Sequence, residues 1–133
     1  MKALTIQQPW ADLIASGIKR VENRSWPTSH RGLIAIHAGA SQKAMKQNSG
    51  LVEGEPVYSA IIAVAEIVDC LPLLDAVQRR LPGDPLEWVV SHEFTEGPYC
   101  WVLENVRRLE KPIPCTGALS LWTVPEEIAR RLE

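Results

Sequence analysis

The longest apolar run of this chain limits its fold more than any other feature. Residues 59–68 read SAIIAVAEIV, and Glu66 is the only charged residue among them. A run of this length, rich in isoleucine and valine, predicts a strand that is buried on both faces. Such burial is typical of a strand inside a curled sheet, so the rest of the chain is expected to supply further strands and covering helices.

Shorter patterns on both sides of this run predict the remaining elements. We expect further strands at residues 3–6, 19–24, 33–38, 99–107 and 119–124. We expect helices at residues 9–16, 41–45 and 73–81, a helical turn at 86–91, and a last helix from residue 125 onward. No linker or internal repeat separates these elements. The sequence therefore predicts one domain over residues 1–133, with an α+β fold in which short helices cap a small barrel of strands.

The composition is that of a globular protein. Apolar residues make up 46% and charged residues 23% of the 133 residues, which is enough to bury a core. No segment has the length and apolarity of a transmembrane helix or a signal peptide. The three cysteines include no C-x-x-C pair, and the three histidines are scattered. These features argue against disulfides and a zinc site, so we expect a cytoplasmic protein with no metal, no cofactor and no membrane partner.

The net charge of −2 conceals an uneven distribution along the sequence. Residues 1–50 contain seven Lys and Arg against two Asp and Glu, whereas residues 51–133 contain seven against fourteen. Such asymmetry is compatible with one basic face that binds a polyanion, or with chance. A weakly acidic protein is a poor candidate for tight, nonspecific binding to duplex nucleic acid. A local site for a few nucleotides is easier to reconcile with this charge.

A second stretch, residues 7–26, concentrates the unusual residues of the chain. Pro9 suits the first turn of a helix, because the N–H that it lacks would have no partner there. One apolar stripe of helical spacing follows at Trp10, Leu13 and Ile14. Gly17 then stands where a left-handed C-terminal cap needs glycine. The stretch therefore predicts a short helix that ends sharply and leads into an extended segment.

That extended segment, residues 19–24, reads KRVENR and has four charges and one clear hydrophobe. Glu22 and Arg24 share one strand face, and Lys19 falls on the other. One interpretation is a charged edge strand that resists aggregation, with an ion pair of small worth. The other is a polar site in which Lys19 contacts an anion, Arg24 offers a planar fork to phosphate or carbonyl oxygen, and Glu22 accepts from a base amino group.

The same stretch resembles the signature of the ASCH domain family. The matching positions are Pro9-Trp10, followed by Gly17-x-Lys19-x-x-Glu22-x-Arg24-x-Trp26. The likeness continues through residues 31–38, 99–103, 112–114 and 117–122, so it covers nearly the whole chain. ASCH domains belong to the PUA-like superfamily of small barrels associated with RNA metabolism. This chain is similar to the small bacterial or phage single-domain type.

The resemblance implies a PUA-like mixed β-barrel that binds RNA or a nucleotide-like ligand in the cleft between the first helix and the charged strand. Under this interpretation the ligand-binding residues are Lys19, Glu22, Arg24, Trp26, Pro9, Trp10 and His37. Trp26 lies in a loop and is expected to stack on a base. His37 ends a buried strand and suits a hydrogen-bonded core residue, but it falls where the family's strand approaches the motif. Protein partners are left open.

The alternative function is a hydrolase that acts on RNA or on a modified nucleoside. Some ASCH-like proteins are ribonucleases, and others are amidohydrolases that deacetylate acetylcytidine with a lysine, a threonine three residues later and a distant glutamate. Lys19 matches the lysine, but Glu22 stands in place of the threonine, and the distant glutamate is open among Glu66, Glu87 and Glu93. If the protein is an enzyme, Lys19 and Glu22 are the catalytic candidates. An adjacent carboxylate favours the ammonium form of Lys19, which is a good anion contact and a poor nucleophile.

Overall fold

The computed structural model of the protein describes residues 1–79 and 81–132. The chain folds into two compact units. Unit 1 comprises residues 1–18, 33–65 and 105–133, and unit 2 comprises residues 19–32 and 66–104. Two long strands, β4 (Ala60–Pro72) and β5 (Tyr99–Pro114), run through both units. No helix among the described residues is long and apolar enough to cross a membrane.

Six strands hydrogen-bond in the order β2-β5-β4-β3-β1-β6. The four shorter strands are β1 (Lys2–Ile6), β2 (Val21–Arg24), β3 (Gly32–Ala38) and β6 (Leu121–Thr123). Strand β1 is parallel to β3 and antiparallel to β6, so the sheet is mixed and its first and last strands pair. All six predicted strands are present, which confirms the α+β class with short helices between the strands.

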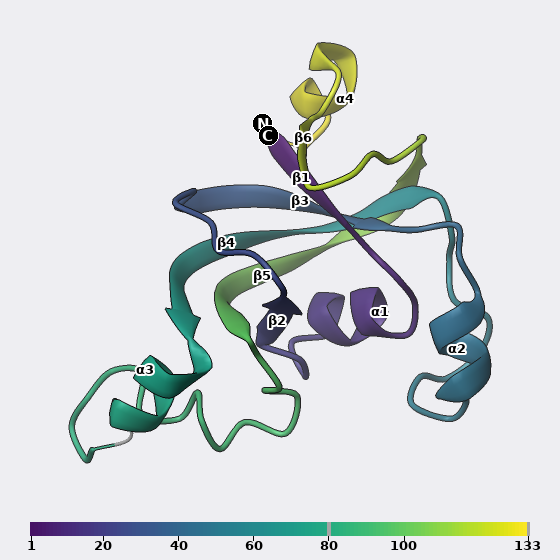
Figure 1. The fold of residues 1–133 in the computed structure, drawn as a ribbon. Helices are drawn as coiled ribbons and strands as arrows, with labels where there is room; N and C mark the ends of the chain where they lie inside the picture. Colours follow the sequence, from purple (N-terminus) through teal and green to yellow (C-terminus); the bar gives the residue numbers. More distant parts are fainter. Residues whose placement is uncertain (80, 133) are drawn as a thin grey trace. The chain divides into compact units, whose positions relative to one another are not determined.

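In unit 1, β1 runs between β3 and β6 (Figure 1), and its Ala3, Leu4 and Ile6 are buried. The buried cluster around it consists of Ala3, Ala35, Ile61, Val64, Ile113, Val124 and Leu132. Helix α4 (Glu126–Arg130) adds Ile128 and Ala129 to this cluster. Short apolar residues on neighbouring strands thus bury one another, which is how a small sheet obtains its stability.

Helix α1 (Trp10–Ala15) buries its predicted stripe only in part, because Leu13 and Ile14 are buried and Trp10 is half-buried. The helix ends as predicted. Gly17 adopts a φ of 82°, and the N–H of Ile18 donates to the carbonyl of Leu13 at 3.0 Å. This is the Schellman arrangement, which needs a residue without a Cβ at the left-handed position.

The start of α1 depends on a residue that the sequence did not single out. Gln8 is fully buried, and its Oε1 accepts the backbone N–H of Asp12 at 2.9 Å. Its Nε2 donates to the carbonyl of Val57 at 2.8 Å. One side chain therefore satisfies a free N–H of the first helical turn and also fixes the loop before β4.

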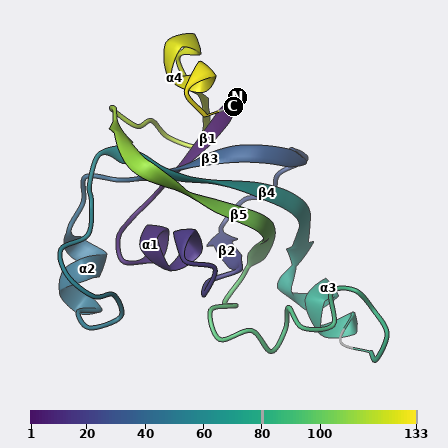
Figure 2. The same cartoon turned by 180° about the vertical axis from the view of Figure 1, so that it is seen from behind.

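Unit 2 is built on the antiparallel pairing of β2 with β5, in which Glu22 faces Trp101 and Arg24 faces Tyr99. Figure 2 shows α3 (Leu73–Gln78) directly after β4, followed by the long connection that returns to β5. The core of this unit is a second cluster, made of Val21, Leu71, Ala76, Leu86, Val89, Cys100 and Val102.

Several predicted boundaries were wrong. Strand β4 extends to Pro72 and β5 to Pro114, beyond the predicted ends at 68 and 107. Helix α2 (Lys43–Gln47) starts two residues later than expected, and α3 ends at Gln78. Residues 86–91 form hydrogen-bonded turns and no continuous helix. In one of these turns the N–H of Val89 donates to the carbonyl of Leu86 at 3.1 Å. Strands β4 and β5 continue through charged residues and proline, because hydrogen bonding to neighbouring strands overrides local propensity.

Candidate functional site

Three charged side chains of unit 2 meet at the start of β2, and we call them the charged cluster: Lys19, Glu22 and Arg24. Lys19 Nζ lies 3.2 Å from Glu22 Oε1. Arg24 holds the other carboxylate oxygen, Oε2, through Nη2 at 2.8 Å and Nε at 3.0 Å. The two oxygens of one carboxylate thus each accept from a different cation, which is an efficient use of its lone pairs.

The sequence explains why these head groups converge. Glu22 and Arg24 are two residues apart on β2, so they share a face of the strand. Lys19 precedes the strand, and its long side chain turns back so that Nζ donates to the carbonyl of Val21 as well as to Glu22. Strand alternation placed Lys19 on the other face, but its long side chain reaches back to the cluster from the start of the strand.

Burial makes the charged cluster unusual. Lys19 is 3% exposed and Glu22 7% exposed, whereas the Arg24 side chain keeps 23% of its surface in contact with solvent. Buried charges are costly unless they are paired and hydrogen-bonded. Two cations share one carboxylate, so the cluster keeps a formal charge of +1, and Arg24 is its most exposed member.

His92 borders the cluster from the turn-rich connection of unit 2. Its Nε2 accepts the backbone N–H of Arg20 at 3.0 Å, so this nitrogen carries no proton. The Arg20 guanidinium lies 3.9 Å above the Trp88 ring and 3.5 Å from Glu104. Burial and the positive charges of Lys19 and Arg20 lower the pKa of His92, although Glu93 opposes this shift. The ring is therefore held in its neutral form.

Asn23 anchors another part of the same connection to β2. Its Nδ2 donates to the carbonyl of Phe94 at 2.7 Å. Its Oδ1 accepts the N–H groups of Glu96 at 2.8 Å and Gly97 at 2.9 Å. Sequence reasoning missed both Asn23 and His92, because their partners lie some seventy residues away. The only available signal was the polar character of residue 23 inside a strand.

Trp26, the predicted stacking residue, is half-buried beside Trp101. The two ring centroids are 4.7 Å apart at an interplanar angle of 84°, which is an edge-to-face contact. Trp101 Nε1 donates to the backbone carbonyl of Trp26 at 3.2 Å. Trp101 itself is fully buried, so it fixes the position of a tryptophan that still reaches the surface.

The other predicted site residues, Pro9, Trp10 and His37, belong to unit 1. Pro9 is buried at the start of α1. His37 is buried, and both of its ring nitrogens have partners: Nδ1 lies 3.1 Å from Thr5 Oγ1, and Nε2 lies 2.8 Å from the carbonyl of Cys115. Because a carbonyl only accepts, Nε2 carries the proton. The structure therefore gives His37 the surroundings of a hydrogen-bonded core residue, and its part in ligand binding stays a prediction.

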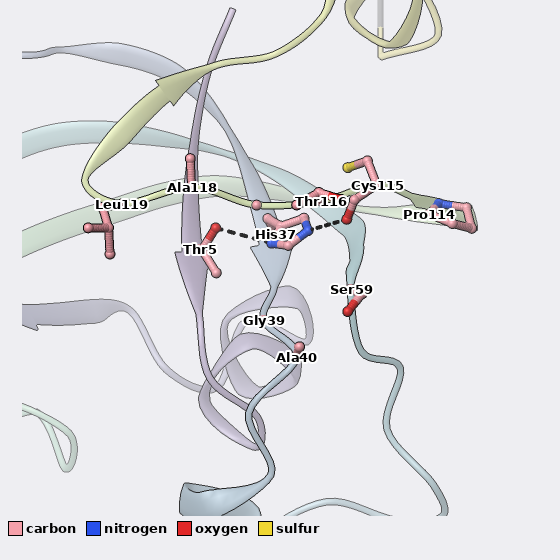
Figure 3. A pocket seen from close by; sticks show the side chains of 11 residues that line it. Thr5, His37, Gly39, Ala40, Ser59, Pro114, Cys115, Thr116, Ala118 and Leu119 are labelled. Atoms are coloured by element: carbon pink, nitrogen blue, oxygen red, sulfur yellow. Dashed lines mark hydrogen bonds between the residues drawn. The ribbon is translucent and has the colours of Figure 1, made fainter.

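The His37 network opens onto a groove that the sequence did not predict. We call it the unit 1 groove; its volume is about 740 Å³. It is lined by Thr5, His37, Gly39, Ala40, Ser59, Pro114, Cys115, Thr116, Gly117, Ala118 and Leu119. Figure 3 shows Thr5 and Cys115 bonded to the His37 ring within this lining. These residues come from four separate stretches of sequence, so no local motif could have indicated them.

The uneven charge distribution along the sequence does not correspond to a basic and an acidic unit in the folded protein. Unit 1 contains eight Lys and Arg against seven Asp and Glu, and unit 2 contains six against nine. The basic residues of positions 1–50 are divided between the two units, so neither unit as a whole is strongly basic. Three of the six positive charges of unit 2, namely Lys19, Arg20 and Arg24, lie within one short stretch of sequence, which favours a small anion-contacting site over a broad basic surface.

Comparison with known proteins now places the chain in a family. The model of the ASCH domain matches residues 4–113. Activating signal cointegrator 1 of Homo sapiens is 28% identical over 138 residues, which cover 94% of this chain and 22% of that protein. The Mus musculus protein of the same name is 27% identical over the same shares. The chain thus spans about a fifth of the length of these curated relatives.

Solved structures confirm the fold. The crystal structure of ASCH from Zymomonas mobilis has a TM-score of 0.59 and 16% sequence identity, covering 98% of this chain and 92% of that one. A variant of the same protein has a TM-score of 0.58 and 17% identity, covering 98% and 94%. At this identity the likeness shows the fold alone, and it confirms the predicted PUA-like class. With the domain match over most of its length, this chain belongs to the ASCH domain family.

Proposed function

We propose that this ASCH domain binds RNA or a nucleotide-like ligand at the charged cluster. One observation carries the proposal: two cations share a single buried carboxylate, and the more exposed cation is an arginine. A site with a residual positive charge and little water around it attracts an anion more strongly than a solvated lysine does. Phosphate is the anion that an arginine fork matches best among common biological ligands.

Each member of the proposed site has a chemical role. Arg24 contacts a phosphate or carbonyl oxygen, and Lys19 supports it with a second positive charge. Glu22 fixes both cations and is the acceptor available to an exocyclic amino group such as that of cytosine. Trp26, held by Trp101 and still reaching the surface, offers a face for a base to stack on. Parts for Pro9, Trp10 and His37 in ligand binding remain predictions from the sequence.

The same geometry argues against Lys19 as the reactive group of a hydrolase. Its Nζ donates to the carbonyl of Val21 and to Glu22, and the side chain is almost fully buried. A nucleophilic or basic lysine needs its neutral form and access to the substrate. Lys19 Nζ is instead engaged by the Val21 carbonyl and by Glu22, so binding is the function that this arrangement supports best.

The test is the affinity of the full chain for a labelled single-stranded RNA. Arg24→Ala should weaken binding by about 1–3 kcal/mol if the guanidinium makes a bidentate contact. Arg130→Ala is the matched control, because it removes the same charge from an exposed ion pair with Glu126 in unit 1. Equal affinity of a folded Arg24→Ala protein and the control would remove Arg24 from the site.

Catalysis is tested with the same proteins. We expect neither acetylcytidine nor the labelled RNA to be consumed by the purified protein. Product that forms with the native chain and disappears with Lys19→Ala would replace the binding proposal with the hydrolase. RNA that is retained and stays intact would support the binding proposal.

A further inference from the structure

The unit 1 groove is a candidate ligand site that differs in chemistry from the charged cluster. Its volume of about 740 Å³ falls within the usual range of ligand pockets, roughly 300–1,000 Å³. No Lys, Arg, Asp or Glu is among its lining residues. Burial raises the pKa of the Cys115 thiol, so this lining residue is uncharged as well. The groove therefore offers nothing that would neutralise a phosphate.

One wall of the groove consists of main chain with free hydrogen-bonding capacity. Residues 116–119 connect β5 to β6, and in the described part of the chain no hydrogen bond engages their backbone. Three of them, Thr116, Ala118 and Leu119, are exposed, and Leu119 keeps 93% of its surface. The backbone N–H and C=O groups of this wall are therefore not used within the described structure and are available to a ligand.

The floor of the groove is closed and neutral. A Cβ added to Gly117 would lie 2.5 Å from Thr5 Oγ1 and 2.7 Å from His37 Cε1, so only glycine fits at this close approach. Trp122 Nε1 donates to Thr5 Oγ1 at 3.0 Å, and both His37 nitrogens have partners. The floor groups are thus already satisfied, and polar recognition falls to the wall and to the hydroxyls of Ser59 and Thr116.

We propose that the unit 1 groove binds an uncharged planar heterocycle of nucleobase size, namely a base of the bound RNA. Adjacent N–H and C=O groups of a main-chain wall match the donor and acceptor series on the edge of a base. Four lining residues, Gly39, Ala40, Gly117 and Ala118, have no side chain beyond Cβ, so they leave room for a planar ring. The choice of RNA as the source of the base rests on the proposed function, whereas the choice of an uncharged ring rests on the groove alone.

The backbone geometry favours a base over a peptide strand. Strand addition needs a straight edge in which several alternate residues face the partner. Here Pro114 lacks an N–H, Gly117 is pressed against the floor, and Ser120 has a φ of 57°, which breaks the extended conformation. The main chain of residues 116–119 is long enough to contact the edge of one base, and too short to form a ladder of hydrogen bonds with a peptide strand.

The experiment is a ¹H–¹⁵N NMR titration of the full chain with the four uncharged ribonucleosides. At least one nucleoside should shift the amide signals of residues 116–119 in a saturable way, and its monophosphate should bind there no more tightly. Ala118→Phe fills the groove from an exposed lining position and should weaken this binding at least tenfold. Ser49→Phe, exposed in unit 1 and outside the lining, is the matched control and should leave the affinity unchanged.

The outcomes separate this inference from the proposed function. Nucleoside binding at residues 116–119 by a native chain that binds no RNA would support the groove as a site for an uncharged ring and overturn the charged-cluster proposal. RNA binding without any nucleoside shift at 116–119 would overturn the groove and leave the other proposal standing. Shifts caused by an uncharged tetrapeptide and by no nucleoside would make the groove a protein-interaction surface and refute the base.

Discussion

The two units bury polar side chains in different ways. In unit 1, Trp122, Thr5, His37 and the Cys115 carbonyl form a chain of hydrogen bonds that contains no carboxylate, ammonium or guanidinium group. In unit 2, the charged cluster buries two cations with one carboxylate and keeps a net charge. The first arrangement joins side chains and a carbonyl by hydrogen bonds alone, whereas the second is an ion-pair cluster with a formal charge of +1. The comparison teaches that the two units of one small chain stabilise buried polar groups by different means: one by hydrogen bonds, the other by ion pairs.

The strongest way to break this comparison is Glu22→Gln. The variant keeps the shape of the side chain but leaves two cations in a largely buried site without a carboxylate. Removing one partner of a buried charge pair typically costs about 3–5 kcal/mol, and we expect a loss of this size in the free energy of unfolding measured with urea.

Glu104→Gln is the matched control for that measurement. Glu104 pairs with Arg20 at 3.5 Å, but both side chains are about 40% exposed. Exposed pairs contribute about 0–1 kcal/mol. If Glu22→Gln were no more destabilising than Glu104→Gln, the charged cluster would behave as a surface ion pair, and the contrast between the units would disappear.

A medium effect is expected from Thr5→Val in the neutral network. The substitution preserves the shape but removes the hydroxyl that lies between Trp122 Nε1 and His37 Nδ1. Leaving buried polar groups unsatisfied costs about 1–3 kcal/mol, so the unfolding midpoint in urea should fall accordingly. Thr123→Val is the control, because its hydroxyl accepts only from the exposed Lys2 at 2.9 Å. Equal stabilities of the two variants would show that the network contributes nothing.

The smallest effect concerns pH and His92. Its pKa lies below the ordinary value of 6.5 in the folded protein, because of burial and the charges of Lys19 and Arg20. As pH falls below about 6.5, the unfolded chain binds a proton that the folded protein does not, so stability decreases until the folded pKa is reached. Above 6.5 this contribution is fully present.

His92→Gln sharpens that prediction, because glutamine offers a neutral acceptor to the Arg20 N–H and does not titrate. The loss of unfolding free energy between pH 7.5 and pH 5.5 should be smaller in the variant than in the native chain. An identical loss in both proteins would show that His92 is not held neutral by its surroundings.

Local chemistry made part of this fold predictable. The six strands followed from apolar runs, and the left-handed end of α1 followed from Gly17. The convergence of Lys19 with Glu22 and Arg24 was also accessible, since all three lie within six residues of sequence. In each case the determining interactions connect residues that are close in the chain.

Features that depend on distant partners were not predictable in this way. His92 reaches the cluster from seventy-two residues away, and nothing around it distinguishes it from a surface histidine. The unit 1 groove combines short segments that pairing of β1 with β3 and β6 brings together. The strand ends at Pro72 and Pro114 were missed because proline is a local signal for a break, whereas sheet pairing is decided by the fold.

The pairing of β1 also determines the order in which the protein can fold during synthesis. Lys2 pairs with Ile34 of β3 on one side and with Thr123 of β6 on the other. A nascent chain therefore carries β1 with one unpaired edge until nearly all later residues have emerged from the ribosome. Unit 1, divided among three stretches of sequence, is completed only after both segments of unit 2 have been made. Strand β1 thus obtains its second partner only late in synthesis. Its unpaired edge is the part of the growing chain at which wrong strand pairing is most favoured.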